Sequence, residues 1–233
     1  MAESLVVKPY EQLRVSSFLR TTYLWMSIGL ILTGAVAWFT AHSPTILSLV
    51  FSSQLTFILL IIAELGLVFY LSARISKMSP ATAMTSFIIY SALSGLTLSV
   101  IFLVFTQESI VSVFFISAGM FLALSIYGFV TKRDLTGWGS FLFMGLIGII
   151  IAMLVNFFLK SSMLAAIISY VGVLVFAGLT AYDTQKLKNM ALHMPSDVDV
   201  GTVRKGAIMG ALTLYLDFIN LFLMLLRIFG DRR

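Results

Sequence analysis

The sequence predicts an all-α integral membrane protein with seven transmembrane helices. Of its 233 residues, 60% are hydrophobic and 11% are charged, whereas an average soluble domain is about 45–50% apolar and about 25% charged. The apolar residues also form long continuous runs, unlike the alternating segments of about ten residues in a membrane β-barrel. Because only helices and closed barrels satisfy their backbone hydrogen bonds in lipid, these runs indicate helices.

The predicted organisation is one membrane domain with two short tails. We expect a cytoplasmic N-terminal tail over residues 1–22, a transmembrane domain over residues 23–230 and a short C-terminal tail over residues 231–233. A run of about 20 apolar residues, at about 1.5 Å per residue, crosses a hydrocarbon layer of about 30 Å. The seven predicted spans are Tyr23–Ala41, Leu55–Ala73, Met84–Thr106, Ile110–Val130, Trp138–Leu159, Met163–Tyr182 and Ala207–Leu226.

The distribution of basic residues predicts the orientation of these spans. Eleven Lys and Arg residues lie on the side of the N-terminus and four on the other side, which together make the 15 in the chain. Cytoplasmic loops carry the excess of Lys and Arg, so we expect the N-terminus inside and, after seven crossings, the C-terminus outside. The same rule explains the net charge of +5, so we expect the lipid bilayer, and not nucleic acid, as a partner. The eleven are Lys8, Arg14, Arg20, Arg74, Lys77, Lys132, Arg133, Lys186, Lys188, Arg204 and Lys205, and the four are Lys160, Arg227, Arg232 and Arg233.

The second span carries two charged residues. Glu64 lies near its centre and Arg74 at its cytoplasmic end. A carboxylate in the middle of a span needs a proton or a partner, so Glu64 is a candidate for an ion pathway. Arg74 has an ordinary interpretation, in which its side chain reaches the interface and serves as an orientation signal. The third span is rich in Ser, Thr and Gly, which is typical of close helix packing, and the fourth and fifth spans lack charges.

The sixth span ends in AYDTQKLK, residues 181–188. Asp183 falls where this helix meets the predicted cytoplasmic interface. Ser169, Gly172, Phe176 and Thr180 lead to Asp183 along one helix face. Two interpretations stay open: a solvated acid at the edge of a loop, or a carboxylate at the mouth of a pocket.

The seventh span places Asp217 near the middle of an apolar run. A charged side chain there costs about 2.5–3.5 kcal/mol on insertion scales. Asp217 belongs to a stripe with spacings of four, three, four and three, formed by Gly206, Gly210, Thr213, Asp217 and Asn220. Gly206 and Gly210 allow a neighbouring backbone to approach closely. The stripe therefore predicts a buried helix whose aspartate is either functional or part of a structural hydrogen bond between helices.

The two aspartates share a pocket if the stripes of the sixth and seventh spans face each other. Two like charges held close together in a low-dielectric interior do not both ionise easily, so such a pair shares a proton. A nearby Arg74 would favour the ionised form. We expect an element whose hydrogen bonding depends on protonation and which holds two helix arrangements in near balance.

Enzyme chemistry finds little support, and we expect neither an enzyme nor a resident cofactor. Cys is absent, which excludes thiolate nucleophiles and Cys-based metal sites. His42 and His193 lie in loops on opposite sides, which argues against a His-ligated zinc hydrolase and an intramembrane Ser–His dyad. An intramembrane aspartyl-protease dyad is conceivable, but LYLDF around Asp217 lacks the glycine-flanked setting of such enzymes. The chain has no P-loop and no dinucleotide fingerprint.

The segments AYDTQKLK (181–188) and LTLYLDFINLFLMLLRIFG (212–230) resemble the bacterial branch of the Bax-inhibitor family, the transmembrane Bax-inhibitor-motif proteins. The likeness covers about residues 20–230, including Glu64, the basic end of the second span and TKRDL at 131–135. The resemblance implies that the seventh helix is central and ringed by the other six. It also implies a multi-pass protein of the bacterial inner membrane that acts as a pH-sensitive calcium leak.

The resemblance also suggests roles for single residues. The paired aspartates of the family match Asp183 and Asp217, and its latching arginine matches Arg74. Calcium prefers six to eight oxygen ligands, so Asp183 and Asp217 would form only a weak, transient calcium site. Two alternatives stay open: a non-conducting regulator that binds other membrane proteins, such as a quality-control protease or a stress-pathway component, and a proton-coupled cation exchanger that uses the same carboxylates.

Overall fold

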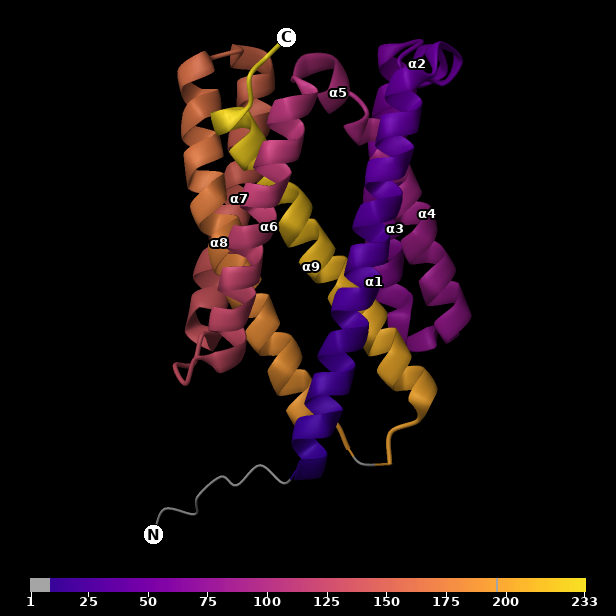
Figure 1. Ribbon diagram of the computed structural model, residues 1–233, viewed down its shortest axis with the longest axis vertical. Coiled ribbons are helices and arrows are strands. Elements are labelled where there is room, and N and C mark those ends of the chain that lie inside the picture. The colour runs from indigo at the N-terminus through magenta and orange to yellow at the C-terminus, as the bar shows by residue number, and fades with distance from the viewer. Residues whose placement is uncertain (1–8, 196) are drawn as a thin grey trace.

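The structure is a computed structural model that describes residues 9–195 and 197–233. Seven of its helices are long and apolar enough to cross a membrane, which confirms the predicted fold class. The described part of the chain contains, in order, α1 (Pro9–His42), α2 (Pro44–Val50), α3 (Gln54–Arg74), the 3-10 turn η1 (Ile75–Lys77), α4 (Pro80–Leu98), α5 (Ile101–Val104), α6 (Gln107–Val130), α7 (Thr136–Leu159), α8 (Ser162–Leu192) and α9 (Val200–Phe229). The start of α1 and the C-terminus lie at opposite ends of the bundle (Figure 1).

Several helix starts follow from capping residues in the sequence. Ser53, Ser79, Thr106 and Ser161 each accept a hydrogen bond from a backbone N–H of the first helical turn, which satisfies a donor that would otherwise have no partner. Asp199 caps α9 in the same way. These caps lie just outside the apolar runs, so they fix where each span begins.

The cap of α9 involves two hydrogen bonds. Asp199 Oδ1 accepts from the backbone N–H of Thr202 at 2.9 Å, and the Thr202 hydroxyl donates to Asp199 Oδ2 at 2.6 Å. The bond from the Thr202 side chain, assisted by the backbone bonds, lowers the pKa of Asp199. The carboxylate also lies at the positive end of the α9 dipole.

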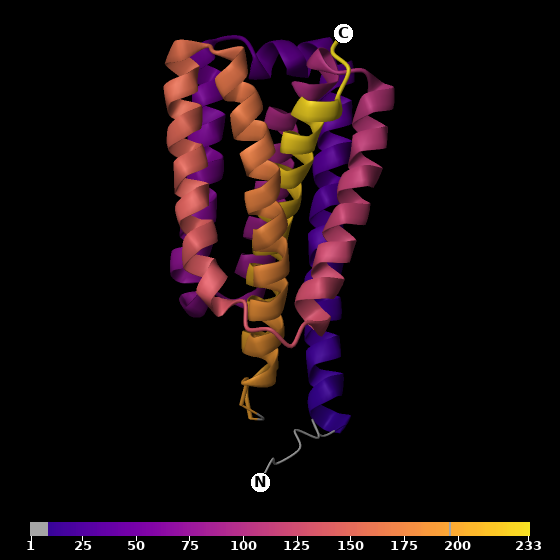
Figure 2. The same cartoon turned by 90° about the vertical axis from the view of Figure 1, so that its left-hand side faces the viewer.

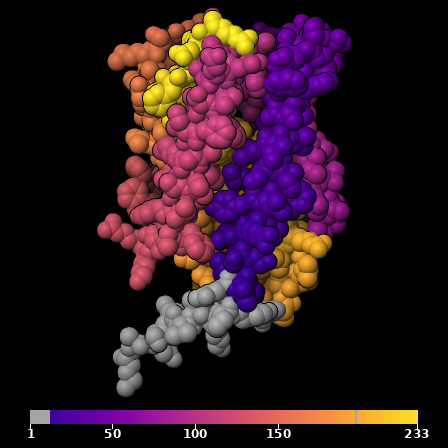
Figure 3. All heavy atoms as spheres, in the orientation of Figure 1, coloured from indigo at the N-terminus to yellow at the C-terminus, as the bar shows by residue number. Residues whose placement is uncertain are grey.

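The seventh span, α9, forms the centre of the bundle. It crosses the molecule obliquely (Figure 1) and packs against α1, α4, α6 and α8. Side chains of α1 and α6 cover much of it on one face (Figure 3), and α8 lies in front of it in the perpendicular view (Figure 2). In its most apolar stretch 67% of the residues are buried, against 6% in α3 and 11% in α7. The central position is thus as expected, but α3 and α7 pack mainly on α4 and α8.

The helix boundaries differ from the predicted spans mainly in four places. Helix α1 is already helical from Pro9, α8 continues to Leu192, α9 begins at Val200 instead of Ala207, and the third span is divided into α4 and α5. The short helix α2, which starts with Pro44 at its first position, was not expected. Hydropathy marks only the apolar part of a helix, so polar turns that extend beyond the membrane and short helices between spans escape it.

The far end of α9 is attached to the loop before α6. The backbone N–H of Thr106 donates to the carbonyl of Asp231 at 3.0 Å, and the N–H of Arg233 donates to the carbonyl of Val104 at 2.9 Å. The backbone N–H of Asp231 also donates to the Ser109 hydroxyl at 3.0 Å. These bonds fix the C-terminal end of α9 to its neighbours.

Candidate functional site

A cavity of about 520 Å³ lies between α3, α7, α8 and α9. Most of its wall is apolar, with side chains such as Val68, Phe143 and Leu212. Its polar lining residues are Ser72, Ser140, Tyr182, Asp183, Lys186, Thr213, Asp217 and Asn220. The stripe predicted on α9 therefore does face a cavity, through its last three members.

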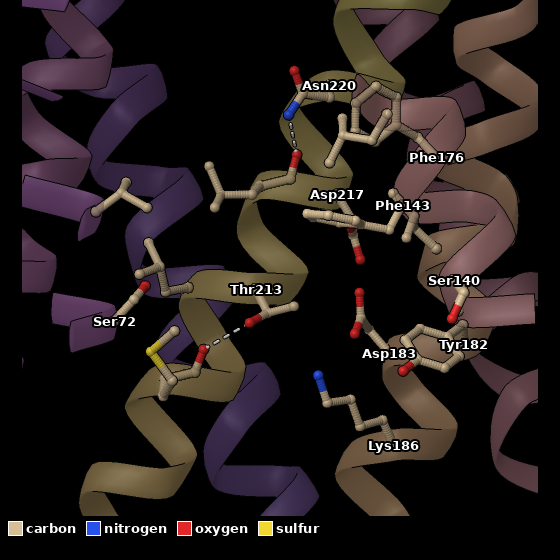
Figure 4. A pocket seen from close by; sticks show the side chains of 17 residues that line it. Ser72, Ser140, Phe143, Phe176, Tyr182, Asp183, Lys186, Thr213, Asp217 and Asn220 are labelled. Carbon is tan, nitrogen blue, oxygen red and sulfur yellow. Dashed lines mark hydrogen bonds between the residues drawn. The ribbon is translucent and has the colours of Figure 1, made fainter. Parts of the chain in front are cut away.

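Asp183 and Asp217 meet in this cavity. Their carboxyl groups point toward each other from α8 and α9 (Figure 4) and interact directly. Asp183 is 8% exposed and Asp217 is 5% exposed, so Asp183 is not a solvated acid at a loop edge. It lies well inside α8, which continues for more than two turns beyond it.

The pair is poorly supplied with hydrogen-bond donors. Asp217 Oδ2 is buried and accepts no hydrogen bond from any group in the described part of the chain. Nearby polar groups on α9 are engaged with the helix itself: the Thr213 hydroxyl donates to the carbonyl of Met209 at 3.1 Å, and the Asn220 amide donates to the carbonyl of Leu216 at 2.8 Å. A buried carboxyl without a donor needs a proton, a cation or water.

Arg74, the predicted latch, is not part of this site in the present conformation. It is exposed at the end of α3 and does not line the cavity. The cation that faces the pair is instead Lys186, whose amino group points toward Asp183 (Figure 4). Sequence reasoning counted Lys186 only as an orientation signal. The available clue was its spacing, since residues three apart on a helix share a face.

Glu64 belongs to a different polar region. The Thr97 hydroxyl donates to Glu64 Oε1 at 2.8 Å, and Glu64 is not among the residues that line the aspartate cavity. Glu64 also interacts with the Ser94 hydroxyl, which in turn contacts Tyr215 on α9. The Glu64 carboxylate thus has partners within the bundle, although few residues of α3 are buried.

Tyr215 connects this second region to α1. It is fully buried, and its hydroxyl is 2.7 Å from the Thr33 hydroxyl. Thr33 donates to the carbonyl of Ser91 at 2.8 Å. Asp217 and Tyr215 are separated by about 200° around the axis of α9, so the central helix presents a polar group to each side.

The two glycines of the predicted packing motif differ in their surroundings. A Cβ atom at Gly210 would lie 2.7 Å from Leu187 Cδ2 on α8 and 3.1 Å from Thr22 Cγ2 on α1. A Cβ atom at Gly206 would be 3.4 Å from the nearest atom, in Phe18, which is an ordinary contact. The close approach of helices is therefore at Gly210.

A second cavity of about 470 Å³ adjoins the first toward the end of the bundle where α1 begins. It is lined by residues of η1, α8 and α9 and shares Asp183, Lys186, Met209 and Thr213 with the first cavity. Asp183 therefore stands where the two cavities meet. In the described residues no group of three or more His, Cys, Asp or Glu side chains could hold a metal ion.

Comparison with known proteins places this chain in a family. The family model described as inhibitor of apoptosis-promoting Bax1 matches residues 15–233. The inner membrane protein YbhL of Escherichia coli K12 is 55% identical over 228 residues, which covers 98% of this chain and 96% of that protein. A protein of Borreliella burgdorferi is 46% identical with 98% of both chains covered, and a membrane protein of Streptococcus pyogenes serotype M1 is 37% identical with 97% of both covered. With the seven apolar helices, these matches support a multi-pass protein of the inner membrane, and they show that the chain belongs to the Bax inhibitor family.

Proposed function

We propose that this protein is a pH-sensitive, calcium-permeable leak channel of the bacterial inner membrane, in which Asp183 and Asp217 bind the ion and control the gate. The observation that carries the proposal is the pair of buried, facing carboxyl groups in a cavity beside the central helix of a seven-helix bundle. Intramembrane acids that face the interior commonly mark an ion or proton pathway.

The gate would depend on what lies between the two carboxyl groups. A shared proton lets one carboxyl group donate to the other, which links α8 to α9. Loss of that proton leaves two negative charges in a low-dielectric setting, where their repulsion is strong. The helices then separate or take up a cation. Protonation would thus bias two arrangements of the central helix.

The dimensions and chemistry of the cavity fit a hydrated divalent cation in transit. Calcium prefers six to eight oxygen ligands, and two carboxylates supply at most four. A cavity of about 520 Å³ leaves room for water molecules, each of which takes about 30 Å³ in the liquid. A site with so few fixed ligands binds weakly, and weak binding is what allows an ion to leave.

Further roles belong to the same proposal. Arg74 would latch onto the aspartates in a conformation other than this one, and Glu64 would serve an ion pathway on the other side of α9. The N-terminus would face the cytoplasm. The calcium ion is the transported substrate and not a resident cofactor.

The test is calcium flux into liposomes that contain only the purified protein, measured with an enclosed indicator from about pH 5 to pH 8. We expect flux to change with pH, and we expect Asp183→Asn and Asp217→Asn each to remove most of that dependence. A change of about tenfold in flux corresponds to about 1.4 kcal/mol. This free energy is smaller than the cost of placing a charged side chain in the middle of a span. Asp197→Asn is the control, because Asp197 is an exposed acid in the α8–α9 loop.

Other outcomes would favour the alternative functions. No flux at any pH, together with a membrane protein recovered in stable complex, would favour the non-conducting regulator. Flux that requires an opposed proton gradient would favour the cation exchanger. Unchanged pH dependence in both Asn variants would reject the aspartate pair as the gate.

A further inference from the structure

Lys186 occupies the junction of the two cavities around Asp183. It is exposed and lines both cavities together with Asp183. Lys186 lies three residues after Asp183 and four after Tyr182 on α8, so the three side chains share one face of the helix. Its amino group is 5.9 Å from the centre of the Tyr182 ring and points toward the aspartates (Figure 4).

The neighbouring lysines are bound elsewhere. Lys205, which lines the second cavity, donates to the carbonyl of Ser76 at 3.1 Å. Lys188, on the same helix as Lys186, donates to the carbonyl of Phe129 at 2.7 Å. Arg74 does not line either cavity. Among the residues that line the aspartate cavity in the described part of the chain, Lys186 is the one that carries a positive charge.

We propose that Lys186 is a tethered counter-cation of the aspartate pocket, which competes with a divalent metal ion for the carboxylate of Asp183. This inference rests on the proposed function and adds a residue that sets the affinity of the site. An ammonium group and a divalent cation repel each other, so both cannot neutralise the same carboxylate at close range. An entering ion would have to displace the lysine.

The side chain is suited to such displacement. Lysine carries a compact charge on a flexible four-carbon stem, and the stem can lie along apolar surface while the charge moves to water. In the present conformation the amino group lies over the Tyr182 ring, in a cation–π contact 5.9 Å from its centre, and faces Asp183 from there. The lysine can therefore approach or leave Asp183 without α8 moving.

The experiment measures calcium binding and does not depend on transport. The thermal unfolding midpoint of the detergent-solubilised protein is followed as calcium chloride is added, and the rise gives an apparent Kd. We expect Lys186→Met and Lys186→Gln to bind calcium about tenfold more tightly than the natural protein. Lys186→Arg keeps the charge and should bind no more tightly. Lys188→Met, which removes the same charge outside the cavity, is the matched control and should leave the Kd unchanged.

A double variant tests whether the effect passes through Asp183. In an Asp183→Asn background, Lys186→Met should give no gain in affinity, because the shared partner is absent. The inference is overturned if Lys186→Met and Lys188→Met have the same Kd, if the gain persists without Asp183, or if none of the Lys186 variants binds calcium. Tighter binding in Lys186→Met combined with no flux in liposomes would support the lysine's role and count only against the leak channel.

Discussion

Asp217 and Tyr215, two positions apart on α9, place polar groups on opposite sides of this helix inside the bundle. Asp217 faces Asp183 across a cavity, whereas Tyr215 is fully buried on the other side with its hydroxyl 2.7 Å from that of Thr33. The tyrosine has a hydrogen-bond partner, but Asp217 Oδ2 has none among the described residues. The hydrogen bond of Tyr215 holds α9 in place on one side. On the other side, the free oxygen of Asp217 is available to a proton, a water molecule or an ion.

At the same scale, the cap of α9 predicts a pH-dependent stability. Its hydrogen bonds lower the pKa of Asp199 below its ordinary value of 3.8. A carboxyl group whose pKa is lower in the folded state stabilises that state above the unfolded pKa, and the contribution is lost as the pH falls through the folded pKa. We therefore expect Asp199→Asn, which keeps an acceptor but not the charge, to lower the unfolding midpoint at pH 7 and to differ less from the natural protein as the pH falls through the folded pKa of Asp199.

The measurement is thermal unfolding in detergent at several pH values, with Asp197→Asn as the loop control. Other acids titrate in the same range, so the quantity of interest is the difference between the natural protein and each variant. A difference that stays constant as the pH falls from 7 through the folded pKa of Asp199 would contradict the role assigned to the Asp199 charge.

Single residues also show what the sequence could predict about the site. Asp183 and Asp217 were identifiable because a carboxylate in an apolar helix is costly and rare. Lys186 was missed because a basic residue at a helix end looks like an ordinary orientation signal, and the direction of a long side chain is set by packing. The position of Arg74 relative to the pocket depends on how α3 packs against α4, which its own sequence does not specify.

At the scale of elements, Gly210 is a point of close approach between α9 and both α1 and α8. We expect Gly210→Ala to be less stable than Gly206→Ala by about 1–3 kcal/mol, because its Cβ would press on the buried side chains of Leu187 and Thr22, whereas the gain in helix propensity is common to both variants. Gly206→Ala meets only an ordinary contact, and alanine is a better helix former by about 1 kcal/mol. Unfolding midpoints of the two variants in detergent provide the comparison. Equal effects, or a larger loss in Gly206→Ala, would place the close approach elsewhere.

The elements themselves were largely predictable. All seven spans were recognisable from hydropathy, because about 20 apolar residues are needed to cross the membrane. The break between α4 and α5 was not, since residues around Ser99 are apolar enough to continue the run. The extension of α8 past Asp183 was also missed, and it is this extension that places Lys186 on the same helical face as the aspartate.

At the scale of the whole molecule, orientation in the membrane is a prediction that can be tested directly. The chain contains no cysteine, so single cysteines can be introduced without removing others. We expect a membrane-impermeant thiol reagent, added to spheroplasts whose inner membrane is intact, to label Ser52→Cys but not Lys132→Cys. Both positions are exposed, in the loops before α3 and before α7. Labelling of Lys132→Cys alone would mean that the N-terminus faces outward.

The attachment of the C-terminus to the loop before α6 has a mechanical consequence. A rod fixed at one end can only swing, and its displacement grows with distance from the fulcrum. At about 1.5 Å per residue, Asp217 lies about 20 Å from Gly230 and Gly206 about 36 Å from it. A tilt of about 5° would shift Asp217 by about 1.7 Å but Gly206 by about 3 Å. A small adjustment at the aspartates would therefore be magnified at the opposite mouth of the bundle.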